Sequence, residues 1–232
     1  MLHLAADEPG QTLHHIVRDG MIDGLVISSV AIGRPWVDEL FDSSLPTVLI
    51  GTHPVRHDLL SVDVENVEST AAAVTHLFDQ GCRRVGCITG LAHRADARQR
   101  LAGFRLAHQR ARRDLDPALI VQGDFTRRGG ARAAARLLEL GVDGIFASND
   151  ESAVGALWTL AHRGLRVPAD VKVAGFDGTA LDEFHEPTLT SIAQPFAEMG
   201  AATVDLLMRL VAGDTDVESV VLEPHLVIGT TT

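Results

Sequence analysis

The chain has 232 residues, with 31 Asp and Glu against 20 Lys and Arg, and its formal net charge is -11. An apolar fraction of 46% and a charged fraction of 22% are typical of a globular protein and exclude a disordered or collagen-like chain. No apolar run approaches the ~18 residues needed to span a bilayer. The acidic balance argues against general binding to phosphate backbones.

Short apolar runs alternate with longer amphipathic runs along the whole chain. The apolar runs predict strands at 25–27, 47–51, 84–89, 119–121, 144–147 and 171–176. The amphipathic runs predict helices over 12–19, 66–79, 94–113, 126–140, 150–163 and 197–210, with Asn66 and Thr126 as N-cap candidates. This alternation is typical of an α/β fold with mainly parallel sheets flanked by helices.

The sequence carries none of the common catalytic or cofactor motifs. It has no GxSxG, GxxxxGK[ST], GxGxxG or HExxH pattern, and its 11 histidines lack a metal-ligand spacing. The two cysteines, Cys82 and Cys87, cannot form a disulfide scaffold or a four-cysteine zinc site, and we expect them to be buried free thiols. We therefore expect no enzyme activity, no cofactor and no metal.

Polar residues follow the predicted strands, at the end where open parallel sheets bind ligands. They are Ser28-Ser29, Thr52-His53, Thr89-Gly90, Gly123-Asp124-Phe125, Ser148-Asn149-Asp150 and Asp177-Gly178. The helix expected from residue 94 opens with Arg94, Arg98 and Arg100. Carboxylates, amides and guanidinium groups hydrogen-bond to hydroxyls, and an aromatic ring covers the apolar side of a sugar. The set predicts a polyhydroxylated ligand.

Several motifs resemble one known family. The stretch 165–177, LRVPADVKVAGFD, is followed by EPTLTSIAQP at 186–195, and further matches include RVGCITG at 84–90, RLAGF at 100–104 and ASND at 147–150. In this order and spacing, over nearly 200 residues, they resemble the effector-binding domain of the lactose-repressor (LacI/GalR) family of transcription regulators.

The resemblance implies a periplasmic-binding-protein-like fold of type I, with two similar lobes, a ligand cleft between them and three chain crossovers. We expect the crossovers near 79–82, 192–196 and 218–221. The amino-terminal lobe would comprise 1–80 plus 195–219, and the carboxyl-terminal lobe 81–193 plus 220–232.

The family's ligand-binding positions map onto particular residues of this chain. Arg100 matches an arginine that grips ligand hydroxyls or a carboxylate, Asn149 the cleft asparagine and Asp177 the aspartate after an aromatic. Phe125 matches the aromatic that covers the ligand. The loop before Arg100 adds Arg94 and Asp96, and Gln194 and Phe196 lie by a crossover.

The resemblance also implies partners. We expect a homodimer, with the helices 66–79 and 150–163 as candidate contact surfaces, and a small-molecule effector, most simply a sugar. Residues 1–6 match the family's second strand, so operator DNA would be contacted only through an N-terminal helix-turn-helix that these 232 residues do not include. Free thiols and the absence of a secretory signal at 1–4 predict a cytoplasmic protein.

Two alternatives remain at this point. A sugar-binding protein of an importer has the same fold, but would be secreted. A sugar-modifying enzyme on an α/β scaffold would need nucleophile or phosphate-binding motifs that the sequence lacks.

Overall fold

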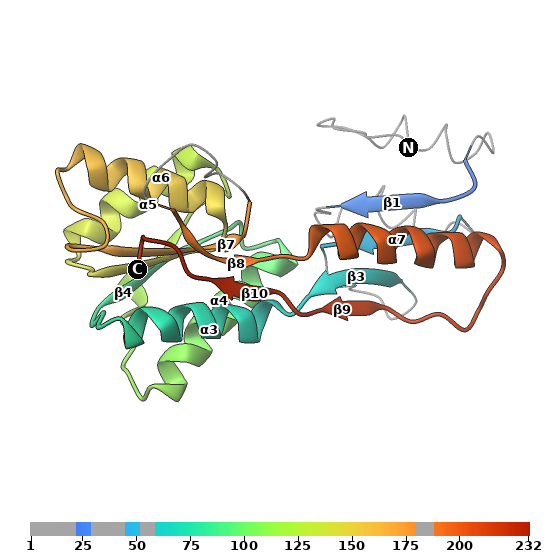
Figure 1. Cartoon of the computed structure of the whole chain (residues 1–232), viewed down its shortest axis with the longest axis horizontal. Coiled ribbons are helices and arrows are strands. Elements are labelled where there is room, and N and C mark those ends of the chain that lie inside the picture. The colour runs from blue at the N-terminus through green and yellow to red at the C-terminus, as the bar shows by residue number, and fades with distance from the viewer. Residues whose placement is uncertain (1–21, 29–44, 52–58, 180–187) are drawn as a thin grey trace. The chain divides into compact units, whose positions relative to one another are not determined.

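The computed structural model describes residues 22–28, 45–51, 59–179 and 188–232 (Figure 1). The strand expected at 1–6 and the helix expected at 12–19 lie outside the described residues. Contacts between Cα atoms divide the chain into two compact units: unit 1 is Met1–Asp63 with Phe196–Leu222, and unit 2 is Val64–Pro195 with Glu223–Thr232. The expected α/β fold with mainly parallel sheets is confirmed.

Unit 1 is built on a four-stranded sheet whose order is β1-β2-β3-β9. The strands are β1 (Leu25–Ser28), β2 (Thr47–Ile50), β3 (Leu60–Val64) and β9 (Val220–Leu222), and the first three are parallel. Helix α7 (Phe196–Val211) packs along β1 and β2. Its Met199 and Leu206 are buried, and Leu207 comes so close to Gly24 that a Cβ there would lie 2.8 Å from it.

Unit 2 is built on a six-stranded sheet whose order is β10-β8-β7-β6-β4-β5. Its strands are β4 (Val85–Thr89), β5 (Ile120–Gln122), β6 (Gly144–Ala147), β7 (Lys172–Asp177), β8 (Thr190–Ala193) and β10 (His225–Val227). All neighbouring strands are parallel except β10, which runs antiparallel to β8. A short 3₁₀ turn, Pro117–Leu119, leads into β5.

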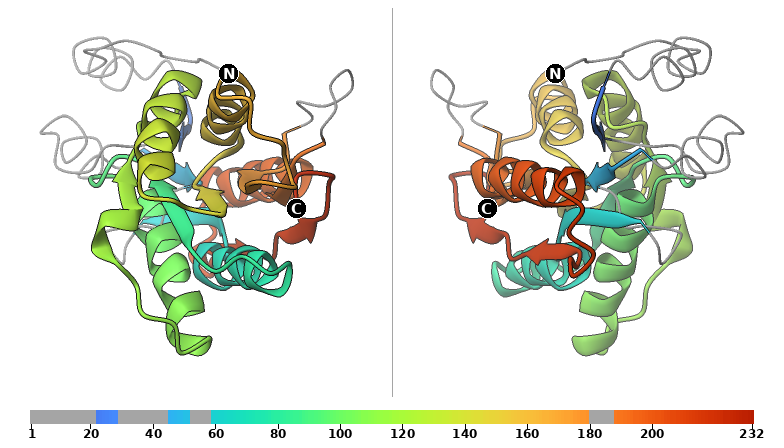
Figure 2. Two further views of the ribbon diagram at one scale, coloured as in Figure 1. Left: turned by 90° about the vertical axis from the view of Figure 1, so that its left-hand side faces the viewer. Right: turned by 90° about the vertical axis from the view of Figure 1, so that its right-hand side faces the viewer.

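Two pairs of helices cover the faces of this second sheet. They are α3 (Asn66–Asp79) with α4 (Ala95–Arg110), and α5 (Arg127–Glu139) with α6 (Asp150–His162). Figures 1 and 2 show α3 and α4, in teal and green, on one face and α5 and α6, in yellow-green and gold, on the other. Glycines allow the close approach: a Cβ on Gly103 would lie 2.3 Å from the Val67 carbonyl oxygen, and one on Gly155 2.0 Å from that of Arg127.

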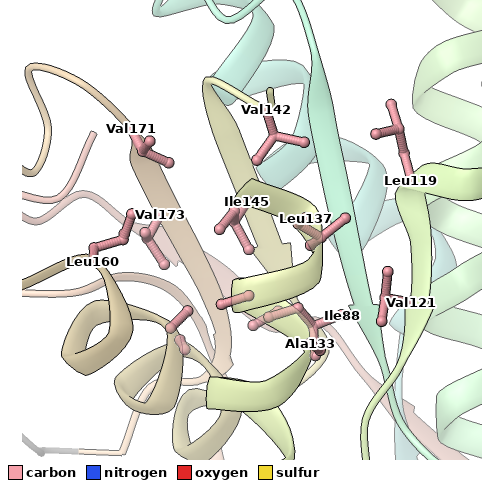
Figure 3. Packing of buried hydrophobic residues seen from close by; sticks show 14 of the residues in the cluster. Ile88, Leu119, Val121, Ala133, Leu137, Val142, Ile145, Leu160, Val171 and Val173 are labelled. Carbon is pink, nitrogen blue, oxygen red and sulfur yellow. The ribbon is translucent and has the colours of Figure 1, made fainter. Parts of the chain in front are cut away.

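One hydrophobic core cluster of unit 2 lies between the sheet and the α5–α6 pair (Figure 3). Leu137 and Leu160 project from these helices onto Ile88, Ile145 and Val173 of the strands, and all five are fully buried. Burying a Leu or Ile side chain stabilises a fold by about 1.5–3 kcal/mol. This layer therefore holds the strand ends, and the residues that follow them, in fixed positions.

The carboxyl-terminal residues anchor to the same sheet. Thr231 is fully buried, its hydroxyl donates to the Val173 carbonyl at 2.7 Å, and it accepts from the Thr190 backbone N–H at 2.9 Å. The backbone N–H of Val173 donates in turn to the Thr231 carbonyl at 3.0 Å. The tail therefore satisfies backbone groups of β7 and β8.

The division into units differs from the expected lobes at the first crossover. Helix α3 belongs to unit 2, because it packs against α4 and lies over β7, so the chain passes between units at 63–64 rather than near 79–82. The other crossings fall at 195–196, within the expected range, and at 222–223 rather than 218–221. The last shift arises because Val220–Leu222 extends the unit 1 sheet as β9.

Two local predictions also need correction. Glu65 caps α3, since its Oε1 accepts from the backbone N–H of Val67 at 3.0 Å, whereas Asn66 is the first helical residue. Helix α4 ends at Arg110 and not at 113, because Arg112 adopts the left-handed φ of 51°. The prediction of Thr126 as a cap is confirmed by its hydrogen bond from the Gly129 backbone N–H at 3.0 Å.

Candidate ligand-binding site

The carboxyl ends of β4, β5, β6 and β7 lie at one edge of the unit 2 sheet, because these strands are parallel. In the strand order, β5 lies on one side of β4 and β6 on the other, and the connections on either side of β5 pass over opposite faces through α4 and α5. Such a reversal of strand order opens a crevice beside the strand ends, where α/β proteins bind ligands. All seven residues predicted to bind ligand lie at or near this edge of unit 2.

Arg100 is the central charged residue of the edge. It is only 5% exposed, and its guanidinium lies over the Phe176 ring at 3.7 Å. Its Nε donates to Asn66 Oδ1 at 2.9 Å, while Nη1 donates to the Ser148 carbonyl at 2.7 Å and to Asp177 Oδ1 at 3.4 Å. Bonded in this way, the rigid fork of donors is held in one orientation.

Asp177 ends β7 in an unusual backbone conformation. Its φ is 125°, and such conformations persist where the surrounding structure enforces them. Here Gln194 binds both the side chain and the backbone of Asp177. Its Nε2 donates to Asp177 Oδ1 at 2.7 Å, and its backbone N–H donates to the Asp177 carbonyl at 3.0 Å. Burial raises the pKa of Asp177, and the Arg100 charge and the Gln194 hydrogen bond counter that effect.

Arg94, Asp96 and Phe125 form a second group at the edge. Arg94 binds Asp96 through two hydrogen bonds, Nε to Oδ1 at 3.0 Å and Nη2 to Oδ2 at 2.7 Å. Burial alone would raise the pKa of Asp96, but the hydrogen bonds from Arg94 and the charges of Arg100 and Arg94 lower it. The Arg94 guanidinium also lies 5.0 Å from the centre of the Phe125 ring, within range of a cation–π interaction.

Phe125 is held close to the end of β4. Its φ is 63°, and a Cβ on Gly90 would lie 2.1 Å from its ring, so the ring occupies the space that a side chain at position 90 would need. The ring is partly exposed and is therefore able to cover a bound molecule.

Asn149 has its amide engaged by the backbone. Its Oδ1 accepts from the Ser152 N–H at 3.0 Å and so caps α6, while Nδ2 donates to the Phe125 carbonyl at 3.0 Å. This residue therefore positions both α6 and the turn that carries Phe125. Its contact with a ligand stays a prediction.

Two further residues, which are not among the predicted ligand-binding residues, support the site. Asp150 is 1% exposed; its Oδ1 accepts from Ser191 Oγ at 2.6 Å, and its Oδ2 accepts from the Thr179 N–H at 2.9 Å. Burial, opposed by these hydrogen bonds and reinforced by the charge of Asp177, raises the pKa of Asp150 to about 7. Asn66 orients Arg100, whereas its sequence pattern indicated only an N-cap.

The predicted residues are thus joined in one chain of contacts. It runs from Asp96 to Arg94, over the Phe125 ring, from the Phe125 carbonyl to Asn149, and from the neighbouring Ser148 carbonyl through Arg100 to Asp177 and Gln194. The chemistry is a fixed cationic fork, a carboxylate and an aromatic ring around one strand edge. Within the described residues, no group of three or more His, Cys, Asp or Glu side chains is placed to hold a metal ion.

Comparison with known proteins assigns this fold. A model of the family described as "Periplasmic binding protein-like domain" matches residues 74–232. The E. coli K12 "HTH-type transcriptional repressor CytR" is 35% identical over 182 residues, which is 75% of this chain and 53% of that protein. The chain therefore spans about half the length of this relative.

No described helix is both long and apolar enough to cross a membrane.

Solved structures of transcription regulators have the same fold. The "transcriptional regulator CelR-cellobiose complex" superposes with a TM-score of 0.92 at 30% identity, over 98% of this chain and 71% of that one. A regulatory protein of the LacI family from Chloroflexus aggregans gives a TM-score of 0.88 at 28% identity, over 98% of this chain and 83% of that one.

Fold and site thus define a domain of the type I periplasmic-binding-protein-like class. The chain belongs to the effector-binding domains of LacI-family regulators. These relatives are transcription regulators.

Proposed function

We propose that this chain senses a sugar or a similar small polar effector for a LacI-family transcription regulator. The observation that carries the proposal is the cluster of Arg100, Asp177 and Gln194 beside the partly exposed Phe125 at the carboxyl edge of the unit 2 sheet. The bound cellobiose named for CelR supports a sugar as ligand. Because the relatives compared above are regulators, they favour this function over the importer alternative.

The site chemistry suits hydroxyl recognition. Asp177 Oδ1 is already bonded by Arg100 and Gln194, whereas no described residue donates to its Oδ2. Oδ2 is therefore able to accept a ligand hydroxyl, and the Phe125 ring to pack on the apolar face of a sugar. Arg100 acts here through its charge and by fixing Asp177.

The effector would act on DNA binding indirectly. Specific duplex recognition needs a helix or ribbon in the major groove and cationic contacts to phosphates. We assign these to an N-terminal helix-turn-helix outside the 232 residues, in a cytoplasmic regulator. Coupling between effector and operator sites is typically worth 1–3 kcal/mol. A mobility-shift assay should show no specific retardation by this chain alone, and a specific nanomolar complex would contradict this division.

A homodimer is part of the proposal, with α6 as its contact surface. Of the two helices predicted for this role, α3 buries its apolar residues Ala71, Val74 and Leu77 within unit 2. By contrast, Trp158 on α6 is 60% exposed and touches only the ring of His162 among aromatic neighbours in the described chain. Light scattering should give twice the 24.8 kDa chain mass and a smaller mass for Trp158→Ala. A monomer for the unaltered chain would contradict the proposal.

A thermal-shift screen of neutral mono- and disaccharides, including cellobiose, tests the sensing function. At least one sugar should stabilise the chain, and calorimetry should show its affinity reduced about 10-fold or more in Asp177→Ala, because a charged hydrogen-bond partner contributes about 1.5–3 kcal/mol. Asp116→Ala, which breaks an exposed pair with Arg84, is the matched control. Equal affinity in Asp177→Ala and the control would reject the site.

A further inference from the structure

Three helices of unit 2 begin at the ligand-binding edge: α4, α5 and α6 each start after a strand that ends there. The first turn of a helix has unpaired N–H groups and a partial positive charge, so it attracts anions. Three such starts and several arginines would make this edge favourable for a phosphate or carboxylate ligand, unless the chain itself supplies the negative charge.

The chain does supply it at each helix start. Asp96 lies in the first turn of α4 and accepts from the Ala97 N–H at 2.8 Å. Asp124 precedes α5 and accepts from the Thr126 N–H at 3.1 Å. Asp150 begins α6 and is followed by Glu151. A side-chain carboxylate therefore lies at or beside each of the three helix starts.

Carboxylates also neutralise four of the arginines near the site. Four pairs lie at or near this edge: Arg94–Asp96 at 2.7 Å, Arg100–Asp177 at 3.4 Å, Arg127–Glu151 at 2.7 Å and Arg132–Asp124 at 3.0 Å. Arg98 is exposed, and its Nη1 bonds to the carbonyls of Ala92 and His93. Of these pairs, Arg94–Asp96 and Arg100–Asp177 are the least exposed, with side-chain exposures of 23% and 10%, and of 6% and 21%.

We propose that Asp96 is a specificity-determining residue that makes this site select neutral, hydroxyl-bearing ligands and reject their phosphorylated or carboxylated counterparts. This inference rests on the proposed function and narrows its ligand class. Asp96 holds this role because it binds Arg94 through both carboxylate oxygens, beside the Phe125 ring. An anion arriving there must compete with Asp96 for Arg94 and is repelled by both Asp96 and Asp177.

The test measures binding of inorganic phosphate, and of ribose against ribose 5-phosphate, at constant ionic strength. Asp96→Asn removes one negative charge beside Arg94 while keeping an oxygen that can accept hydrogen bonds. We expect it to bind phosphate at least about 10-fold more tightly than the unaltered chain, the effect of a single charged partner. Asp116→Asn makes the same charge change in an exposed pair and should gain nothing.

Two further variants make the test independent of one substitution. Asp96→Ser replaces the carboxylate with a neutral hydroxyl, should also gain phosphate affinity, and serves if Asp96→Asn does not fold. The double variant Arg94→Gln with Asp96→Asn also removes the Arg94 charge. It should therefore lose the increase in phosphate affinity expected for Asp96→Asn. Far-UV circular dichroism establishes which variants are folded.

The outcomes separate this inference from the proposed function. If the unaltered chain binds ribose 5-phosphate more tightly than ribose, the edge still binds effectors but the role of Asp96 is refuted. If a folded Asp96→Asn or Asp96→Ser gains no phosphate affinity, the role is refuted as well. If phosphate binds Asp96→Asn as expected but no neutral sugar binds the unaltered chain, the charge argument holds and the sugar class of the proposed function fails.

Discussion

Replacing Arg100 by Ala should destabilise unit 2 strongly, whether or not a ligand is present. The substitution removes the Arg100 donor from three acceptors: Asn66 Oδ1, the Ser148 carbonyl and Asp177 Oδ1. Asp177 Oδ1 keeps its hydrogen bond from Gln194 Nε2. Ser148 is 1% exposed and Asn66 2%, so water reaches these groups poorly. Removing one partner of a buried ion pair costs about 3–5 kcal/mol, and we expect a loss of this size in the free energy of unfolding.

The partner variant Asp177→Asn should cost much less, about 1 kcal/mol or less, because burial already penalises the Asp177 charge and Arg100 keeps its bonds to Asn66 and Ser148. Urea unfolding followed by far-UV circular dichroism measures both, since four of the five described helices lie in unit 2. A loss below about 1 kcal/mol in Arg100→Ala, or an equal loss in both variants, would refute this reasoning.

Three further predictions follow from buried groups of unit 2. The pKa of Asp150 is raised to about 7 in the fold, so its ionisation destabilises the folded chain. As pH rises from about 4 to about 7, the free energy of unfolding of the unaltered chain should fall by up to about 4 kcal/mol relative to that of Asp150→Asn. A difference between the two in urea unfolding that does not depend on pH would contradict this. Thr231→Val should cost about 1–3 kcal/mol by stranding the Val173 carbonyl and the Thr190 N–H, and an unfolding free energy within about 0.5 kcal/mol of the original would oppose it. Burial raises the pKa of Cys82 to about 11 and that of Cys87 to about 12, so an aromatic disulfide reagent at pH 8 should label neither thiol until the chain unfolds; rapid labelling of the folded chain would count against it.

The helix bounds could be predicted from the sequence where caps and glycines mark them. The predicted ranges for α3, α5, α6 and α7 agree with the structure within one residue at each end, because Thr126 starts α5 and glycines such as Gly141 and Gly164, with φ near 70°, follow the helix ends. The end of α4 was misjudged because an arginine, not a glycine, adopts the left-handed conformation there.

Four strands of the structure are not marked by apolar runs in the sequence. Strands β3, LSVDV, and β8, TSIA, carry polar residues that are nevertheless buried, namely Ser61, Asp63, Thr190 and Ser191. Strands β9 and β10 have three residues each, too few to show a period. Sheet pairing across distant parts of the chain stabilises such strands, and a local pattern does not contain that information.

The location of the candidate site residues at one sheet edge could be predicted from the sequence, but their pairings could not. The rule that ligands bind beyond parallel strand ends placed Phe125, Asn149 and Asp177 at one edge. Which carboxylate each arginine binds depends on side-chain geometry between separate elements, as in Arg100 of α4 and Asp177 of β7. The same holds for Asp150, whose two partners lie on β8 and after β7.

The most direct test of whether the carboxyl edge of the unit 2 sheet holds the effector is hydrogen–deuterium exchange. Exchange is measured for the free chain and for the chain with the strongest binder from the neutral-sugar screen. A ligand bound there should slow exchange of the backbone amides that follow β4, β5, β6 and β7, at 90–95, 123–127, 148–150 and 177–179, because bound ligand suppresses local opening. Slower exchange confined to other segments, with these four unchanged, would contradict the account.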